Sequence, residues 1–139
     1  MTDQEVDDRV AIRELLLRYA RGVDARDLVL VASCFTPDAC YRGALATGTI
    51  ADALAALPAA MGRYTATRHA ITGQSVEIDG DTAHSRADCT AQHWLPDGGC
   101  RTVGVRYRDD LVRTADGWRI ARRDVEHLWT RGEEETDDG

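Results

Sequence analysis

Residues 67–94, "TRHAITGQSVEIDGDTAHSRADCTAQHW", decide the fold class of this chain. An Asp-Gly step at Asp79 and Gly80 divides two runs of strand-forming residues, and such a step is among the strongest short-range signals for a β-hairpin. The same stretch carries three of the four histidines. It therefore predicts two long antiparallel strands, and it raises the question of whether an imidazole in them works as a base.

Two further turn signals, "PDGG" and "TADG", follow this hairpin and extend it. Together the three turns predict a four-strand meander over residues 65–79, 82–95, 100–114 and 117–130. On the second of these strands small residues alternate with polar ones and end in His93, which suits the lining of a cavity. His84 has the opposite parity, so we expect it to be solvated.

Three helices are predicted before the meander. The first begins at Thr2 or Asp3, because apolar residues then recur at three- and four-residue steps, and it ends near Gly22. The second covers "ARDLVLVASCF" and stops before the following proline. The third covers "TIADALAALPAAMG", with Thr49 near its start and Pro58 kinking or ending it. The intervening "ACYRGALATG" is typical of a short strand or hairpin.

Helices first and strands afterwards indicate an α+β fold. We expect three N-terminal helices packed on a strongly curved antiparallel sheet, forming a cone with an internal cavity. Residues 1–131 are predicted to be a single domain. Residues 132–139, "GEEETDDG", are predicted to be a disordered acidic tail, because they have almost nothing to bury.

Composition excludes several classes of function. The formal net charge of -7 argues against nucleic acid, whose phosphates need a basic surface. The acidic N-terminus lacks the apolar run of a secretory signal, and the longest strongly apolar stretch, "LVLVASCF", is far short of the ~20 residues that span a membrane. We therefore expect a cytoplasmic protein that binds no membrane. The four cysteines lack a C-x-x-C pair, so free thiols are expected and a metal site is not.

Asp24 and His69 are the candidate catalytic pair. Asp24 follows the expected end of the first helix, and His69 lies on the first long strand, from which its side chain can enter the cavity. A buried carboxylate needs a partner, and a histidine that donates one ring N–H to a carboxylate is held in a single tautomer. The pair would then form a general base. In the alternative reading, Asp24 caps the second helix and His69 is a satisfied core histidine.

The chain resembles the SnoaL-like family of the nuclear-transport-factor-2-like superfamily over almost all of residues 5–130. The resemblance rests on the following segments: "IRELLLRYARGVDARD", "CFTPDACYRG", "TRHAITG", "DGDTAHSRA" and "RYRDDLVRTADGWRIARR". It implies the cone-shaped fold. Within the family the chain is similar to scytalone dehydratase, hexachlorocyclohexane dehydrochlorinase and bile acid 7α-dehydratase, which use an Asp–His dyad without a cofactor; here the dyad falls on Asp24 and His69.

The resemblance also implies further site residues. The bile acid dehydratase pattern places a tyrosine at Tyr19 and an arginine at Arg123, which would stabilise a developing oxyanion or assist a leaving hydroxyl. The scytalone dehydratase pattern places substrate contacts at Tyr41 and His93, and we add His127 as a lining residue. That pattern also has a tyrosine directly before the aspartate, where this chain has Val23, which argues against scytalone itself as substrate.

The orientation of Arg123 depends on strand parity. Strict alternation puts Arg123 and His127 on one face of the last strand and Trp118 on the other, where Trp118 would pack against the helices or a neighbouring subunit. Arg123 would then enter the cavity and pair with Asp24, with a substrate oxygen or with both. A β-bulge near Ala121 would instead bring its neighbour, Arg122, into that place.

The expected function is a cofactor-independent lyase or isomerase acting on a small, largely apolar, oxygenated molecule. Elimination of water is the first choice. The alternatives are cyclisation or double-bond migration in a polyketide- or steroid-like substrate, and a non-catalytic small-molecule-binding protein of the same fold. Because relatives of this pattern are commonly trimers or dimers, we also expect a homo-oligomer in which the open face of the sheet is buried.

Overall fold

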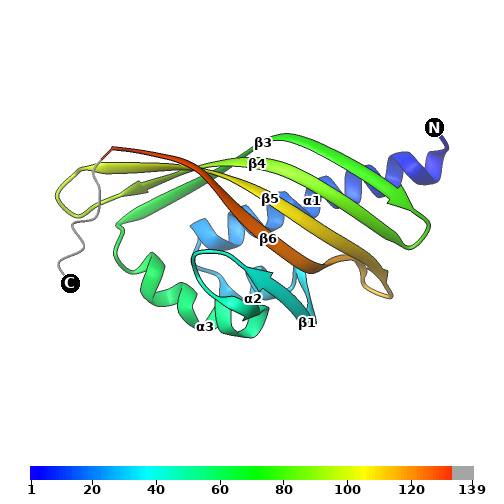
Figure 1. Cartoon of the computed structure of the whole chain (residues 1–139), viewed down its shortest axis with the longest axis horizontal. Coiled ribbons are helices and arrows are strands. Elements are labelled where there is room, and N and C mark those ends of the chain that lie inside the picture. The colour runs from blue at the N-terminus through cyan, green and yellow to red at the C-terminus, as the bar shows by residue number, and fades with distance from the viewer. Residues whose placement is uncertain (133–139) are drawn as a thin grey trace.

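The computed structural model describes residues 1–132 of the chain. Figure 1 shows one long helix, α1, lying behind a curved, twisted sheet, with the two shorter helices near the C-terminal end of α1. The elements follow one another in this order: α1 (Asp3–Asp24), α2 (Leu28–Ala32), β1 (Phe35–Arg42), β2 (Thr47–Thr49), α3 (Ile50–Met61), β3 (Ala66–Asp79), β4 (Thr82–Trp94), β5 (Cys100–Thr114) and β6 (Gly117–Gly132). The α+β class and the four-strand meander are confirmed.

The six strands form one sheet in the order β2-β1-β6-β5-β4-β3. All neighbouring strands are antiparallel except β1 and β6, which pair in parallel. The expectation of a purely antiparallel sheet is therefore wrong at this one junction. The meander alone would leave β6 as an open edge, and β1 supplies the strand that covers it.

Helix α1 is longer than the sequence predicts. Its N-terminus is as expected, because the Thr2 side chain accepts a hydrogen bond from the backbone N–H of Glu5 at 3.1 Å. The helix does not end at Gly22 but continues to Asp24. A Cβ at Gly22 would lie 2.8 Å from Val31 Cγ2, so this glycine allows α2 to approach α1 closely instead of terminating the helix.

The two shorter helices begin at side-chain caps. Asp27 caps α2 by accepting from the backbone N–H of Leu30 at 3.0 Å. The predicted extent of this helix over residues 25–35 is wrong, because the helix begins only after this cap and Phe35 already belongs to β1. Thr49 caps α3 by accepting from the backbone N–H of Asp52 at 3.2 Å. Pro58 does not end α3, which continues through it to Met61. Within residues 1–132, strands β1 and β2 separate α3 from the other two helices.

The face assignment of β4 is confirmed. Its buried residues alternate along the strand: Ala83, Ser85, Ala87, Cys89, Ala91 and His93. The His84 side chain lies on the other face and is exposed. One side of this strand therefore packs inward and carries His93 toward the helices.

Strand β6 contains the bulge that decides where Arg123 points. Asp110 pairs with Arg122 and the next residue of β5, Leu111, pairs with Ile120, so Ala121 is the extra residue. Ile120 and Arg123, three residues apart, consequently face the same side, and both are fully buried. The predicted separation of Trp118 and Arg123 onto opposite faces is wrong, and Arg122 remains exposed although a bulge is present.

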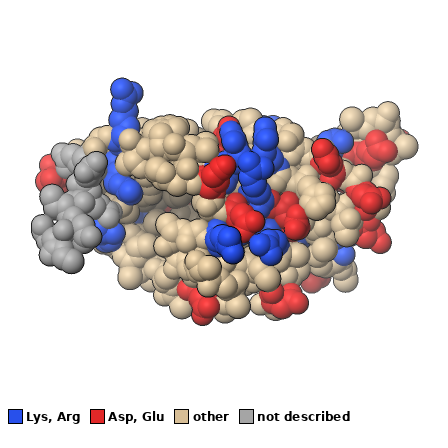
Figure 2. Space-filling view, viewed as in Figure 1, with Lys and Arg blue, Asp and Glu red and all other residues tan. Residues whose placement is uncertain are grey.

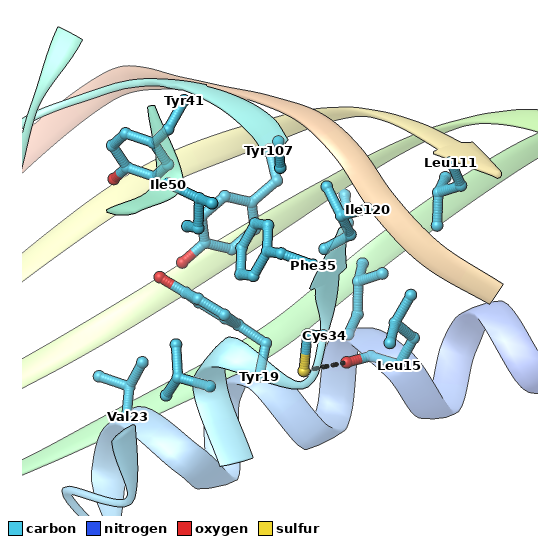
Figure 3. Close-up of a cluster of buried hydrophobic side chains, with 14 of the residues drawn as sticks. Leu15, Tyr19, Val23, Cys34, Phe35, Tyr41, Ile50, Tyr107, Leu111 and Ile120 are labelled. Atoms are coloured by element: carbon cyan, nitrogen blue, oxygen red, sulfur yellow. Dashed lines mark hydrogen bonds between the residues drawn. The ribbon is translucent and has the colours of Figure 1, made fainter. Parts of the chain in front are cut away.

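An ion pair and one cluster of apolar side chains join the helices to the sheet. Asp8 of α1 accepts two hydrogen bonds from Arg113, at 2.7 and 2.9 Å, and a third from Trp118 Nε1 at 3.1 Å. Figure 3 shows part of the buried cluster, which includes Leu15 and Ile120. Strand β6 includes Gly132, the first residue of the predicted tail; the other residues of that tail lie outside the described residues.

Candidate active site

Asp24 and His69 meet at the junction of α1 and β3. His69 Nδ1 lies 2.7 Å from Asp24 Oδ1, and the backbone N–H of His69 donates to Asp24 Oδ2 at 2.8 Å. An ionised carboxylate can only accept, so Nδ1 carries the proton of the first bond. The predicted contact between these two side chains is confirmed, and the alternative in which Asp24 caps α2 is wrong because Asp27 occupies that position.

A third residue completes the hydrogen bonding of Asp24. Thr67 Oγ1 donates to Asp24 Oδ1 at 3.0 Å. Arg26, in the turn after α1, has a left-handed backbone φ of 55°. Its guanidinium donates to Thr67 Oγ1 at 3.4 Å and to the carbonyl oxygens of Met61 and Tyr64 at 3.1 Å each. The turn after α1 is therefore tied to the chain that enters β3, and the carboxylate is fixed in orientation.

The Asp24 carboxylate is held in its ionised form. Partial burial by itself raises the pKa of Asp24. Three interactions outweigh burial and lower this pKa below its ordinary value: the hydrogen bonds from the His69 side chain and backbone, the charge interaction with that ring, and the hydrogen bond from the Thr67 hydroxyl. The His69 side chain is only 10% exposed. This arrangement suits a carboxylate that orients an imidazole and compensates a positive charge on it.

His69 lies on the wall of a cavity of about 370 Å³ between the sheet and the helices. The polar and aromatic side chains on this wall include four of the predicted site residues: Tyr19, Tyr41, His93 and His127. Much of the remaining wall is aliphatic, including Val23, Leu45, Leu57, Val103, Val105 and Val125. Asp24 stands behind His69, away from this wall.

The second cavity histidine, His93, comes from the end of β4. Its Nδ1 lies 3.2 Å from the carbonyl oxygen of Arg101, which can only accept a hydrogen bond. Its ring centroid lies 5.9 Å from that of His69 and 4.7 Å from that of Tyr64. His69 and His93 therefore lie close together on the cavity wall, and His69 is paired with a carboxylate.

The remaining predicted lining residues differ in exposure. Tyr41 of β1 is buried, and burial raises the pKa of its hydroxyl, so it is a neutral hydrogen-bond donor. His127 of β6 is exposed at the cavity margin, where its Nε2 forms a hydrogen bond of 2.7 Å with Thr130 Oγ1.

Arg123 is buried as expected, but its partner is not the one predicted. Its Nε and Nη2 donate to Asp109 Oδ1 and Oδ2 at 2.8 and 2.9 Å, and both side chains are fully buried. Its guanidinium carbon lies 4.3 Å from the ring centroid of Tyr19 and 4.0 Å from that of Tyr107. Asp109 therefore compensates the charge that was expected to reach Asp24 or a substrate.

Sequence reasoning missed two residues of this region, Tyr107 and Asp109. Both lie in the segment "RYRDD" of β5 and share a parity with the buried Leu111, so the alternation of that strand could have placed them inside. Their pairing with Arg123 has no local signal, because it depends on the register between β5 and β6. Tyr107 also lines the cavity.

The outer face of the sheet is charged. Figure 2 shows acidic and basic side chains gathered over the middle of the face turned toward the viewer. Ion pairs on this face include Arg106 with Asp88 at 2.8 Å and His84 with Asp110 at 2.6 Å. A hollow of about 290 Å³ there is lined mainly by such charged residues. Within residues 1–132, no cluster of three metal-ligating side chains and no membrane-spanning helix is found.

Comparison with known proteins agrees with this architecture. The chain is 36% identical over 125 residues to Rv2910c of Mycobacterium tuberculosis, covering 86% of this chain and 84% of that protein. It is similar to the crystal structure of Kfla4162 from Kribbella flavida, with a TM-score of 0.82, 35% identity and coverage of 93% and 95% of the two chains. A scytalone dehydratase candidate from Novosphingobium aromaticivorans has a TM-score of 0.87 at 17% identity, with coverage of 96% and 93%.

The family assignment rests on the sequence profile as well as on these likenesses. The profile of the SnoaL-like domain matches residues 4–124, which run from the start of α1 into β6. The solved structures share the arrangement of helices and curved sheet over nearly the whole chain. The chain therefore belongs to the SnoaL-like family, within the nuclear-transport-factor-2-like superfamily.

Proposed function

We propose that the protein is a cofactor-independent lyase that eliminates water from a small, largely apolar, oxygenated molecule. The observation that carries this proposal is the 2.7 Å contact between His69 Nδ1 and Asp24 Oδ1 at the wall of a cavity of about 370 Å³. A neutral imidazole that donates from Nδ1 has the lone pair of Nε2 as its proton acceptor. The volume is at the small end of the range for small-molecule sites, which suits a small substrate.

In the proposed reaction, His69 Nε2 takes a proton from a carbon next to a carbonyl group. The electron pair of that C–H bond moves into an enolate, and Asp24 stabilises the imidazolium that results. Collapse of the enolate forms the C=C bond and expels a hydroxyl from the adjacent carbon, which leaves as water with the proton of the imidazolium. Tyr19 would donate to the oxyanion, while Tyr41, His93 and His127 would contact the substrate.

Isomerisation and cyclisation begin with the same proton abstraction, so they are the second candidate. The aliphatic wall formed by Val103, Val105 and Val125 favours a hydrocarbon ring as part of the substrate, as in a polyketide- or steroid-like molecule. The dehydratase-like structural neighbour supports elimination at the level of fold alone.

The proposal is tested by deuterium exchange, which reports proton abstraction without knowledge of the natural substrate. Exchange of the hydrogens next to the carbonyl of 2-tetralone and of 4-hydroxybutan-2-one in D2O is followed by NMR with the wild-type protein, Asp24→Asn and His69→Gln. We expect catalysed exchange by the wild type and a loss of roughly 100-fold or more in either variant, the range for removal of a general base.

The chain offers a matched control in the exposed pair His84 and Asp110, whose contact of 2.6 Å is of the same type but lies outside the cavity. His84→Gln and Asp110→Asn are expected to leave exchange unchanged. Wild-type exchange no faster than that of an equal concentration of free imidazole would refute the lyase and isomerase proposals, and ligand binding without exchange would instead support a non-catalytic binding protein.

We further propose that the protein is a dimer or trimer assembled through the outer face of the sheet. The ion pairs on that face, such as Arg106 with Asp88, would make such an interface polar. Sedimentation equilibrium at low and high salt tests this proposal, because a monomer at both salt concentrations would contradict it.

A further inference from the structure

The ion pair between Arg123 and Asp109 lies directly behind one wall of the cavity. The two residues are register partners on β6 and β5, and neither side chain has any exposed surface. Burial by itself lowers the pKa of Arg123, but the charge of Asp109 and its hydrogen bonds outweigh burial and raise it, so the guanidinium remains cationic. Within residues 1–132, its Nη1 has no hydrogen-bond partner.

Two tyrosine rings enclose this cation. The guanidinium carbon lies 4.3 Å from the ring centroid of Tyr19 and 4.0 Å from that of Tyr107, which are cation–π distances. The two rings also meet edge to face, with centroids 5.8 Å apart. Arg123 therefore holds both rings in place, and its charge draws electron density from them toward the buried side.

Tyr19 and Tyr107 lie between the ion pair and the cavity, because both rings pack on Arg123 and both residues line the cavity. Figure 3 shows Tyr19 on α1 and Tyr107 on β5 within the same buried cluster, and their rings meet edge to face. Both residues line the cavity into which His69 also faces. Burial raises the pKa of each hydroxyl in spite of Arg123, so both keep their protons near neutral pH and can donate hydrogen bonds.

We propose that the hydroxyls of Tyr19 and Tyr107 act as a pair of donors to the substrate carbonyl oxygen, and that Arg123 is a positioning residue behind them that does not touch substrate. This inference rests on the proposed function and deepens it. When His69 takes the proton, the carbonyl π electrons move onto oxygen, where two preorganised donors stabilise the negative charge. The buried cation strengthens these donors, and its hydrogen bonds to Asp109 prevent it from turning toward the ligand.

The test uses two aromatic probes that differ in the oxyanion. The 4-nitrophenolate ion carries a delocalised negative charge on oxygen, as an enolate does, and nitrobenzene has the same ring without that oxygen. Affinities of both probes are measured by titration at a pH where the phenol is ionised. Tyr107→Phe and Tyr19→Phe each remove one hydroxyl while retaining the ring that packs on Arg123.

We expect each phenylalanine variant to bind 4-nitrophenolate about tenfold or more weakly than the wild type, because a hydrogen bond to a charged group is lost. Nitrobenzene affinity is expected to change by less than about threefold, which shows that the cavity is intact. Equal losses for the two probes, or no loss for 4-nitrophenolate in Tyr107→Phe, would overturn the donor pair. So would a wild-type protein that binds 4-nitrophenolate no more tightly than nitrobenzene.

The role of Arg123 is tested with Arg123→Met combined with Asp109→Leu, because removing one charge alone leaves the other buried without a partner. The double variant is expected to lose affinity for 4-nitrophenolate, to raise the pKa of bound 4-nitrophenol and to keep its affinity for nitrobenzene. A merely structural role of Arg123 would leave the pKa of the bound phenol unchanged, and that result would overturn the positioning role.

These measurements involve no cleavage of a C–H bond, so they separate the two proposals. Loss of 4-nitrophenolate binding in Tyr107→Phe, together with deuterium exchange that does not depend on His69, would keep the donor pair and remove the base chemistry. Unchanged 4-nitrophenolate binding in Tyr107→Phe, together with deuterium exchange that depends on His69, would keep Asp24 and His69 as the base and remove Tyr107 from the mechanism.

Discussion

Replacing Arg123 by methionine should destabilise the fold more than any surface substitution. The side chains of Arg123 and Asp109 are both 0% exposed, and two hydrogen bonds of 2.8 and 2.9 Å join them. Arg123→Met leaves the Asp109 carboxylate in the protein interior without a counter-charge, which costs about 3–5 kcal/mol. Loss of the cation from the faces of Tyr19 and Tyr107 adds about 0.5–2 kcal/mol. For a domain stable by about 5–15 kcal/mol, this removes a large part of the free energy of unfolding.

The double variant Arg123→Met/Asp109→Leu isolates the ion pair from the packing around it. Replacing both charges by apolar side chains of similar volume is often neutral or stabilising, so the double variant should recover most of the lost stability. The assay is urea unfolding followed by tryptophan fluorescence, with the free energy of unfolding obtained by linear extrapolation for the wild type, both single variants and the double variant.

The reasoning would be refuted by either of two results. A loss below about 1 kcal/mol in Arg123→Met would mean that Asp109 is not truly buried or finds water. A double variant as unstable as the sum of the two single variants would mean that the two side chains act independently, and that the loss comes from packing alone. The melting temperature provides a second reading, with roughly 3 °C expected for each kcal/mol lost in a domain of this size.

Three further predictions concern the helix α1 and acid stability. Asp8→Ala should lower the free energy of unfolding, measured by urea unfolding, by about 1–3 kcal/mol, because Trp118 Nε1 and Arg113 lose a charged hydrogen-bond acceptor. The contribution of Arg113 to this loss is reduced because its side chain contacts solvent. Gly22→Ala should destabilise by about 1–2 kcal/mol despite the better helix propensity of alanine, because its Cβ would meet Val31 Cγ2 at 2.8 Å, and an increase in melting temperature would contradict this. The folded state lowers the pKa values of Asp8 and Asp24 from 3.8. Both carboxylates therefore contribute stability that is fully present above about pH 4 and is lost as the pH falls through their folded pKa values. The free energy of unfolding, measured from about pH 6 to about pH 2, should show this fall, and the Asp8→Asn variant should show a smaller one.

The boundaries of the meander strands and the starts of α1 and α3 could be predicted because their signals are local, whereas α2 begins at Leu28 and not at residue 25. The Asp-Gly step at Gly80 fixes a turn by its own backbone preferences, and Thr2 and Thr49 cap helices with hydrogen bonds three residues away. The same locality explains one error. Gly22 has the residue type of a helix end, but its conformation is decided by Val31 of the next helix, which no local rule includes.

The candidate dyad was found because residue chemistry and a family resemblance agreed on Asp24 and His69. Their 2.7 Å contact joins residues 45 positions apart, and nothing in the local sequence around either residue specifies it. Asp27, three residues further along, caps α2 through a local hydrogen bond, whereas only the tertiary fold brings His69 to the Asp24 carboxylate.

The class of the fold, the order of its elements and the residue types available to the cavity follow from patterns within a few residues, so the amino-acid sequence is enough to predict them. The tertiary structure alone decided the partner of Arg123 and the place of Tyr107 beside it. The physical reason is the bulge at Ala121, which turns Arg123 to the buried side of β6, together with the register that sets Asp109 opposite it. A shift of one residue in either would have turned that charge to the solvent, and only the packing of the whole sheet selects between the two.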